Sequence, residues 1–432
     1  MNETASSEVP TTVRRGKLVV VGQGYVGLPL AMRSTEVGWD VIGVDVDETR
    51  VKRLLGGESY VEDITDEVLR TALSSGRYQA STDYSDAIDF DVAVITVPTP
   101  LREGIPDLTY IEEASRSLAG MLRPGAVVVL ESTTYPGTTQ ELVAPILEEG
   151  SNLTAGADFC LGYSPERIDP GNQQWTLVTT PKVVSGVNAK SLAAVRGFYD
   201  SVVDSTVPVS SPREAELAKL LENTFRHVNI ALINELAMYA HALGIDVWEA
   251  IDAASSKPFG FMRFTPGPGV GGHCLPIDPS YLSWQVKRSL GHPFRFVELA
   301  NDINDHMPDY VVRRVIASLN ADKKAVNGAR ILLLGLAYKK NTGDARESPA
   351  NRVAELLSAM GADVRASDPH VVEGLPSRGI TRVDLTAHEV ERAELVVMLT
   401  DHDSFDLDLV KARAGRILDC RRVPDLASAE RL

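Results

Sequence analysis

The stretch from Lys17 to Gly27, KLVVVGQGYVG, decides the fold. An apolar run typical of a buried strand leads into Gly22, Gly24 and Gly27, which match G-x-G-x-x-G at the start of a helical stretch. The first two glycines permit a tight turn and a close backbone approach to a pyrophosphate, and the third permits close packing of helix on strand. Asp45 ends the next apolar run, where its carboxylate can accept hydrogen bonds from ribose hydroxyls. This order of elements predicts a dinucleotide site.

A glycine-rich turn needed only for packing is the alternative to a dinucleotide site. Asp45 argues against it, because such a turn needs no acidic side chain at the end of the next strand. The same carboxylate would repel a 2′-phosphate, so the sequence favours NAD over NADP. Arg50 lies nearby and would weaken this preference, although we interpret it as a solvated helix residue.

Alternating strand and helix patterns continue on both sides of the chain's middle. Apolar runs at Val92–Val97 and Ala126–Leu130 predict further strands of a parallel, doubly wound sheet. Glu214–Leu243 contains almost no helix breaker and predicts one long helix, with shorter helices to about residue 320. Apolar runs at Arg330–Leu334 and Leu395–Leu399 predict a second α/β unit.

The expected fold class is therefore α/β, with two Rossmann-like doubly wound parallel-sheet domains joined by a helical middle domain with a long central helix. We expect a flexible tail over 1–14, an NAD-binding domain over 15–208, a helical central and dimerisation domain over 209–322 and a C-terminal α/β domain over 323–432. A long helix must bury both of its faces, so we also expect a homodimer or a higher homo-oligomer.

Composition restricts the possible partners. The 432 residues include 59 acidic and 43 basic ones, which gives a formal net charge of −16. A field of that sign disfavours nucleic acid and anionic membranes, so any anionic ligand must be held by local positive groups. No signal peptide and no apolar run of about 18 residues is evident, so no membrane span is expected. Three cysteines without metal-type spacing fit a cytoplasmic protein without a metal site.

One cysteine stands apart from the other two. Cys160 and Cys420 read as small buried apolar residues. Cys274 follows a run rich in glycine, where the backbone is open to close approach by a ligand. Asp278 comes four residues later and would reach it if a helical turn begins there. His273 is adjacent, but neighbouring side chains diverge, so its direct participation stays open.

Lys219 and Asn223 are four residues apart on the long predicted helix, so they share one face. An exposed lysine is the ordinary alternative. Apolar neighbours indicate, however, that the helix is substantially buried. A lysine and an amide on one face could stabilise a developing oxyanion.

Taken together, these features resemble the nucleotide-sugar 6-dehydrogenases, the family of UDP-glucose and UDP-N-acetylhexosamine dehydrogenases, over about residues 16–425. The resemblance rests on blocks that occur in order along the chain: Gly22–Gly27, Val97–Leu101, Glu131–Gly137, Ser164–Arg167 with Asp169–Gly171, Lys219 with Asn223, Gly271–Cys274 with Asp278, and Gly335–Lys339 with Asp344–Pro349.

The resemblance implies an oxidation of the sugar's C6 alcohol to a carboxylate with two NAD⁺, through a thiohemiacetal and a thioester on Cys274. Lys219 and Asn223 would hold the oxyanion. Glu166 and Asp278 would manage protons and water, and Thr133 would position a water or the C6 oxygen. The implied catalytic set is Cys274, Lys219, Asn223, Asp278, Glu166 and Thr133.

The resemblance also implies ligand contacts, with the C-terminal domain binding the nucleotide sugar. The expected cofactor-binding residues are Gly22, Gly24, Tyr25, Val26, Gly27, Asp45, Pro98, Thr99, Thr133 and Arg346. The expected substrate-binding residues are Glu166, Arg167, Lys219, Asn223, Arg263, Gly271 and Lys339. Lys339 would grip the diphosphate, and Arg346 would reach the cofactor or close the cleft.

Departures from the family pattern concern the choice of sugar. Pro170 stands where UDP-glucose enzymes of the family commonly carry a second glutamate, and His273 stands where they often carry serine. Both departures favour a UDP-N-acetylglucosamine or UDP-N-acetylmannosamine substrate. Arg263 and Thr265 are atypical of that branch and could contact the sugar or a neighbouring subunit. UDP-glucose and TDP-glucose stay open, because one methyl group separates uracil from thymine.

Two other classes of function are weaker alternatives. A two-electron β-hydroxyacid dehydrogenase would share the glycine-rich domain and a catalytic lysine, but it needs neither Cys274 nor a second α/β unit. A non-catalytic nucleotide-sugar binding protein would be expected to lose Cys274, Lys219 or Glu166, and all three are present.

Overall fold

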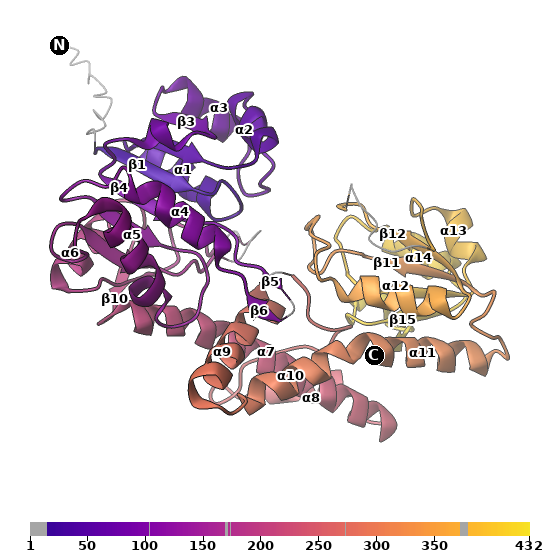
Figure 1. Cartoon of the computed structure of the whole chain (residues 1–432). Coiled ribbons are helices and arrows are strands. Elements are labelled where there is room, and N and C mark those ends of the chain that lie inside the picture. The colour runs from indigo at the N-terminus through magenta and orange to yellow at the C-terminus, as the bar shows by residue number, and fades with distance from the viewer. Residues whose placement is uncertain (1–14, 103, 169–171, 173, 273, 372–378) are drawn as a thin grey trace, which may run out of the picture. The chain divides into compact units, whose positions relative to one another are not determined.

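The computed structural model describes residues 15–102, 104–168, 172, 174–272, 274–371 and 379–432, apart from the side chain of Cys274. The tail predicted over 1–14 therefore lies outside the described residues. The chain forms two compact units, one up to Leu220 and one from Leu221, and each is described by itself (Figure 1). The division falls inside helix α7 (Pro212–Ala242). The predicted boundaries near 208 and 322 stay predictions.

The first unit is built on a six-stranded parallel sheet with the strand order β3-β2-β1-β4-β7-β8. Its strands are β1 (Lys17–Val21), β2 (Asp40–Val44), β3 (Tyr78–Ser81), β4 (Val92–Ile95), β7 (Val127–Leu130) and β8 (Cys160–Tyr163). Its helices are α1 (Gly27–Glu36), α2 (Glu48–Leu55), α3 (Asp66–Ser74), α4 (Thr109–Ala119), α5 (Ala144–Ser151) and α6 (Ala189–Tyr199). Two-stranded pairs are formed by β5 (Leu101–Arg102) with β6 (Ile105–Pro106) and by β9 (Lys182–Val184) with β10 (Thr206–Pro208).

Both faces of this sheet are covered, which explains why its strands read as unbroken apolar runs. Successive side chains of a strand point to opposite faces. Leu18 and Val20 accordingly belong to one buried cluster, with residues of α1, α2, α3 and α6. Val19 and Val21 belong to another, with residues of α4 and α5. The doubly wound sheet predicted from the sequence is confirmed.

The second unit repeats this topology. Its six-stranded parallel sheet has the order β13-β12-β11-β14-β15-β16. The strands are β11 (Arg330–Leu334), β12 (Asp363–Ser367), β13 (Ile380–Arg382), β14 (Leu395–Met398), β15 (Ile417–Asp419) and β16 (Glu430–Arg431), and its helices are α12 (Pro349–Ala359), α13 (Ala387–Arg392) and α14 (Leu407–Arg413). Ile331 and Leu333 face one buried cluster, and Leu332 and Leu334 face the other.

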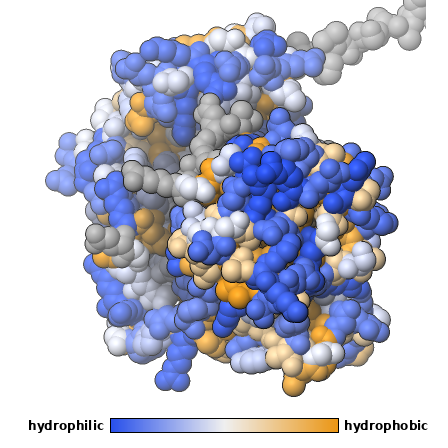
Figure 2. All heavy atoms as spheres, turned by 90° about the vertical axis from the view of Figure 1, so that its right-hand side faces the viewer, coloured by the Kyte–Doolittle hydropathy of each residue, from blue (hydrophilic) through white to orange (hydrophobic). Residues whose placement is uncertain are grey.

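Helices fill the middle of the chain, as predicted. α7 runs without interruption from Pro212 to Ala242, because no glycine and no further proline occurs before Gly244. The others are α8 (Val247–Ser255), α9 (Cys274–Leu290), α10 (Arg295–Asp305) and α11 (Met307–Ala321). Within the described residues, no helix is long and apolar enough to span a membrane. On the face shown in Figure 2, hydrophilic side chains predominate and hydrophobic ones form small groups.

Candidate active site

The predicted cofactor residues of the first unit meet at one edge of its sheet. β1, β4, β7 and β8 are parallel neighbours, so the segments that follow their carboxyl ends share this edge. Gly22 follows β1, Pro98 follows β4, Thr133 follows β7 and Glu166 follows β8. The strand order reverses between β1 and β4, which is where doubly wound sheets bind nucleotides.

The conformation and surroundings of the glycines fit the roles that their spacing predicts. Gly22 has a φ of +91°, and a Cβ atom there would lie 2.9 Å from the carbonyl oxygen of Thr96. A Cβ atom at Gly27 would lie 1.8 Å from the carbonyl oxygen of Gly22, so helix and strand could not pack as they do. At Gly24, by contrast, a Cβ atom would meet nothing within 4 Å. Helix α1 has no side-chain cap on its first turn. An open loop and an uncapped helix N-terminus fit a pyrophosphate.

Asp45, the predicted acceptor for a ribose, is held by backbone donors. Its carboxylate is buried and accepts hydrogen bonds from the backbone N–H groups of Gln23 at 2.9 Å and Asp47 at 3.0 Å. Arg50 is half-exposed and lies 3.7 Å from Asp45, so it pairs with this carboxylate as well as extending into solvent. Tyr60 donates from its hydroxyl to the carbonyl oxygen of Gln23 at 2.6 Å. Burial, and then the charge of Asp45, raises the pKa of Tyr60, which stays protonated.

The other predicted cofactor residues of this unit differ in exposure. Tyr25 is exposed beside the glycine loop, whereas Thr99 is buried and Thr133 is half-buried. Ser132 donates to the carbonyl oxygen of Val97 at 2.7 Å and so ties the segment after β7 to the one after β4. The open glycine loop, the uncapped N-terminus of α1 and the carboxylate of Asp45 together fit NAD.

Glu166 belongs to a buried charge network that sequence reasoning missed. Lys182 on β9 donates to Glu166 at 3.2 Å and also pairs with Glu131, the residue directly after β7. Tyr199 donates to the second oxygen of Glu131 at 2.6 Å. Lys182 and Glu131 are almost fully buried. One signal was available, since a lysine that begins an otherwise apolar strand is unusual.

This network gives the carboxyl groups of Glu131 and Glu166 different pKa values. Burial raises the pKa of Glu131 to about 7, against the opposing charge of Lys182. Burial pushes the pKa of Glu166 upward as well, but Lys182, the hydrogen bond with Glu131 and the charge of Lys219 lower it below its ordinary value. Glu166 is therefore the more acidic member of the pair and Glu131 the less acidic one.

Lys219 lies close to Glu166, as the prediction of a shared site requires. Its ammonium group donates to the backbone carbonyl oxygen of Glu166 at 2.6 Å, and its side chain is largely buried. Glu216, one turn earlier on α7, is fully buried and accepts from Thr139 at 2.7 and 2.9 Å and from Gly137 at 2.6 Å. Sequence reasoning missed Glu216, which ties α7 to the segment that follows Thr133.

In the second unit, Asn223 and Asp278 are in direct contact. The amide of Asn223 on α7 donates to the carboxylate of Asp278 on α9 at 2.5 Å, and both side chains are buried. Helix α9 begins at Cys274, which is the helical turn that the sequence-based expectation required. Cys274 and Asp278 therefore share a face of α9 by position. The side chain of Cys274, and His273 and Pro170 entirely, lie outside the described residues.

The glycine-rich loop before α9 rests on the loop that carries Lys339 and Arg346. A Cβ atom at Gly271 would lie 2.7 Å from the Cβ atom of Tyr338. The N–H group of Gly272 donates to the carbonyl oxygen of Arg346 at 3.2 Å. The Arg346 guanidinium itself is held by Asp344, at 2.9 and 2.7 Å. Lys339 is half-buried in this loop.

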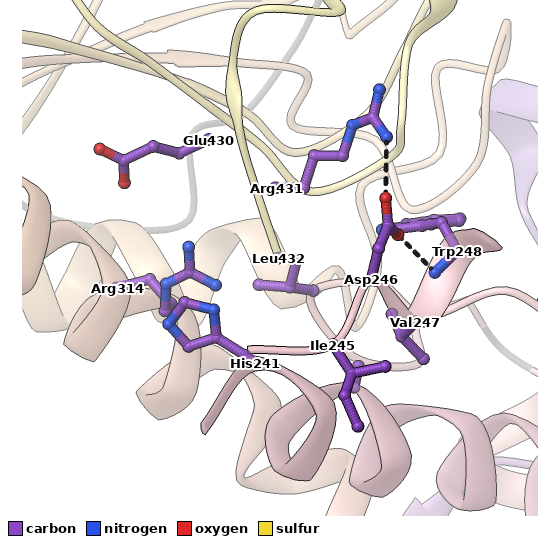
Figure 3. Close-up of a pocket in the computed structure, with 10 residues that line it drawn as sticks. His241, Ile245, Asp246, Val247, Trp248, Arg314, Glu430, Arg431 and Leu432 are labelled. Carbon is purple, nitrogen blue, oxygen red and sulfur yellow. Dashed lines mark hydrogen bonds and ion pairs between the residues drawn. The ribbon is translucent and has the colours of Figure 1, made fainter. Parts of the chain in front are cut away.

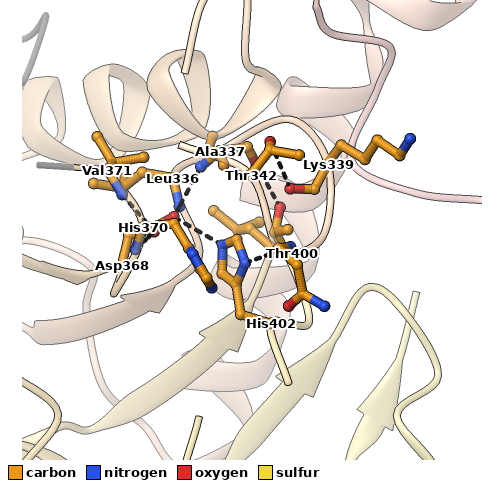
Figure 4. A network of polar contacts seen from close by, with 12 residues as sticks. Leu336, Ala337, Lys339, Thr342, Asp368, His370, Val371, Thr400 and His402 are labelled. Atoms are coloured by element: carbon orange, nitrogen blue, oxygen red, sulfur yellow. Dashed lines mark hydrogen bonds and ion pairs between the residues drawn. The ribbon is translucent and has the colours of Figure 1, made fainter. Parts of the chain in front are cut away.

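A buried histidine and aspartate shape the loop that contains Lys339 (Figure 4). Asp368 accepts from the backbone N–H groups of Leu336 at 2.6 Å and Ala337 at 2.9 Å, and from His402 at 3.0 Å. Because Nδ1 of His402 accepts from the N–H group of Asn341 at 2.9 Å, the proton on its neutral ring is placed on Nε2. Burial raises the pKa of Asp368, but His402 and the backbone donors lower it well below its usual range.

The remaining predicted residues lie as follows. Arg263 pairs with Asp252 of α8 at 2.7 Å. Arg167 donates to the carbonyl oxygen of Pro181 at 2.6 Å. Cys160 and Cys420 are buried, as predicted, and burial raises the pKa of the Cys420 thiol to about 12. In the described part of the chain, no group of three or more His, Cys, Asp or Glu side chains could hold a metal ion.

A dinucleotide site at the switch point of one sheet, with a second doubly wound sheet in the same chain, defines a dehydrogenase with two nucleotide-binding folds. The chain belongs to the UDP-glucose/GDP-mannose dehydrogenase family. It matches the NAD binding domain of that family over residues 16–203, the central domain over 213–306 and the UDP binding domain over 332–425. The predicted resemblance is confirmed. The protein is an NAD-dependent oxidoreductase that acts on a nucleotide sugar.

Several relatives are similar over most of their length. The chain is 37% identical to the UDP-N-acetyl-D-mannosamine dehydrogenase of Pyrococcus horikoshii, over 90% of each chain. It is 35% identical to the enzyme of that name from Escherichia coli K12, over 89% of this chain and 93% of that one. It is 37% identical to the UDP-N-acetyl-D-glucosamine 6-dehydrogenase of Pseudomonas aeruginosa, over 86% of this chain and 87% of that one.

Solved structures give the same result. The UDP-D-ManNAc dehydrogenase of Pyrococcus horikoshii matches with a TM-score of 0.85 and 35% identity, over 94% of this chain and 95% of that one. A UDP-glucose dehydrogenase from Pyrobaculum islandicum matches with a TM-score of 0.86 and 30% identity, over 98% of both chains.

Asp45 and Arg50 together should set the choice of cofactor. We expect Asp45→Asn to raise the KM for NAD⁺ by about tenfold, because one charge-assisted hydrogen bond to the ribose is lost. Arg50→Gln should lower kcat/KM with NADP⁺ by a similar factor, about tenfold, and leave NAD⁺ kinetics nearly unchanged. Initial rates with both cofactors measure this. An Arg50→Gln enzyme that loses activity with NAD⁺ instead would contradict the assignment.

Lys182 should be essential for stability, because its removal takes away the buried cation that pairs with both Glu131 and Glu166. Lys182→Met should lower the free energy of unfolding by about 3–5 kcal/mol, measured by urea titration. Lys190→Met, at an exposed site on α6, is the matched control and should change it by less than about 0.5 kcal/mol. Equal effects of the two substitutions would show that the network does not stabilise the fold.

Proposed function

We propose that the protein oxidises C6 of a UDP-N-acetylhexosamine to the carboxylate, with two NAD⁺ per sugar. The contact between Asn223 and Asp278 carries this proposal, because it joins the predicted oxyanion holder to the helix that begins at Cys274. The names of the relatives from Pyrococcus horikoshii, Escherichia coli and Pseudomonas aeruginosa support the choice of an N-acetylhexosamine. UDP-glucose is the second candidate, since the enzyme from Pyrobaculum islandicum carries that name.

The reaction needs two oxidations and one hydrolysis. NAD⁺, which the glycine loop and Asp45 would hold, would supply the hydride acceptor for both oxidations of C6. Between them, the Cys274 sulfur forms a bond to the C6 aldehyde carbon and loses its proton, which gives a thiohemiacetal. The second oxidation turns this adduct into a thioester, and water then breaks the C–S bond, releasing the carboxylate and the thiol.

Lys219 and Asn223 would stabilise the negative charge that develops on the C6 oxygen. They lie four residues apart on α7, and both are largely buried, so their hydrogen bonds to an oxyanion would be strong. Each is already held, Lys219 by the carbonyl oxygen of Glu166 and Asn223 by Asp278. Little reorganisation would therefore be needed as the charge forms.

Asp278 and Glu166 would move the protons. Asp278 lies one turn after Cys274 on α9, and this spacing supports Asp278 as the acceptor of the thiol proton. Glu166 is kept anionic by Lys182 and Lys219, so it can act as the base for the hydrolytic water. Thr133, at the same sheet edge as Glu166, would position that water.

The loop carrying Lys339 would bind the diphosphate, with Lys339 supplying the charge that the acidic chain lacks overall. Arg346 would contribute once a ligand competes with Asp344 for its guanidinium. Because Cys274 must stay a thiol, a reducing cytoplasm is the compartment that suits the reaction.

We also propose a homodimer formed through α7. Six large apolar side chains on this helix are exposed and recur at helical spacing: Leu217, Leu221, Phe225, Leu232, Leu236 and Tyr239. They form one face of α7, which we call the α7 apolar face. A contiguous apolar face of this kind marks a protein interface, and a second copy related by a two-fold axis would cover it symmetrically.

The stoichiometry of NADH tests the reaction. With the correct UDP-sugar, we expect two NADH per sugar from absorbance at 340 nm. Cys274→Ser should lower turnover by about a thousandfold or more, because the thioester cannot form. UDP-N-acetylmannosamine, UDP-N-acetylglucosamine, UDP-glucose and TDP-glucose are compared in parallel. One NADH per sugar, or full activity without the thiol, would exclude the four-electron route.

Light scattering tests the dimer. The wild-type protein should have twice the mass of the 46.8 kDa chain at micromolar concentration. Leu236→Glu, which places a charge in the α7 apolar face, should shift the mass to that of one chain. Lys411→Glu, an exposed substitution on α14, is the control and should stay dimeric. A monomeric wild-type protein would refute the proposal.

A further inference from the structure

A cavity lies at the C-terminal end of α7, within the second unit (Figure 3). Its volume is about 360 Å³, which is in the range of small-molecule sites. It is lined by Ala237, His241, Ile245, Asp246, Val247, Trp248, Arg314, Glu430, Arg431 and Leu432. None of these residues has a role in the proposed dehydrogenase reaction.

Arg314 on α11 is the unusual member of this lining. Its side chain is only 7% exposed, and its Nη1 atom is buried without a hydrogen-bond partner. Among the described residues, no carboxylate forms an ion pair with it. Figure 3 shows its guanidinium group beside His241, on the side of the cavity where Glu430 and Leu432 also lie. A buried guanidinium without a counter-charge is costly, so this position favours an anion.

The acidic residues in the wall are already engaged elsewhere. Glu430 accepts from Arg416 at 2.6 Å and from Ser318 at 3.1 Å. Asp246 caps α8 by accepting from the N–H groups of Trp248 and Glu249, and it lies 3.6 Å from Arg431. Glu430 and Asp246 therefore pair with other groups, and neither compensates the positive charge of Arg314.

A second buried donor in the wall also lacks an acceptor. The indole N–H group of Trp248 is buried and has no hydrogen-bond acceptor among the residues that the structure describes, and Trp248 is only 3% exposed. Burial, and then the charge of Arg314, lowers the pKa of His241, so its ring is neutral at pH 7 and adds no competing charge. The wall also contains the apolar side chains of Ala237, Ile245, Val247 and Leu432.

We propose that this cavity is a binding site for a small organic anion, separate from the dehydrogenase site. The acid group, a carboxylate or a phosphate, would pair with Arg314, which forms two-pronged hydrogen bonds with either. An apolar body would occupy the space beside Trp248 and Ile245. Trp248 and Arg314 come from α8 and α11, so the ligand would bridge two helices of the second unit.

Calorimetric titration of the full-length protein tests this site. The probes are benzoate, phenyl phosphate, uncharged benzyl alcohol and inorganic phosphate. We expect one of the two aromatic anions to bind, and which one binds identifies the acid group. Benzyl alcohol should not bind measurably, and inorganic phosphate should bind at least tenfold more weakly than the aromatic anion. Arg314→Met should raise the Kd of the aromatic anion at least tenfold.

The control is Arg313→Met, which removes the same charge from an exposed neighbour on α11 and should bind like the wild type. Thermal unfolding supplies a second readout. Because no carboxylate of the described residues pairs with Arg314, Arg314→Met without ligand should unfold at or above the wild-type midpoint. A lower midpoint, or a variant that does not fold, would mean that the protein itself satisfies the guanidinium and would overturn the proposal. Binding that is absent, or unchanged in Arg314→Met, would overturn it as well.

Discussion

A buried aspartate directly after the second strand fixes the first loop of each doubly wound sheet. Asp45 accepts from the N–H group of Gln23, and Asp368 accepts from those of Leu336 and Ala337. A buried carboxylate needs such donors, and a loop with free N–H groups needs such an acceptor, so neither is stable without the other. The positions of the glycine loop in the first unit and of the Lys339 loop in the second both depend on this pairing.

The two aspartates differ in how many of their lone pairs remain free to accept a hydrogen bond from a ligand. Asp368 is surrounded by donors, because His402, His370 and Val371 add their N–H groups to those of the first loop. Asp45 accepts from two backbone groups and has Arg50 at 3.7 Å, so it retains lone pairs for a ribose. One topology therefore supports cofactor binding in the first unit, whereas in the second the aspartate serves the architecture of the loop.

Local sequence patterns predicted the strands and helices of the two sheets. Contacts between residues that are distant in the sequence could not be predicted from them. The runs Lys17–Val21 and Arg330–Leu334 match strands β1 and β11, because strands buried on both faces are continuously apolar. Glu131 and Lys182, however, lie 51 residues apart. An isolated charged residue normally reads as exposed, so only the strand pairing reveals a buried network. For the same reason His402 could not be connected with Asp368.

Two buried cations, Lys182 and Arg314, differ in how their charge is compensated. Lys182 is buried, but two carboxylates compensate it, so it stabilises the fold and sets the acidity of Glu166. Arg314 is nearly as buried, and no carboxylate in the described part of the chain pairs with it. A cation that stabilises the fold has its counter-charge within the protein. A cation that binds a ligand lacks a counter-charge until the ligand supplies one. By this criterion, Lys182 belongs to the architecture of the first unit and Arg314 to a binding function of the second.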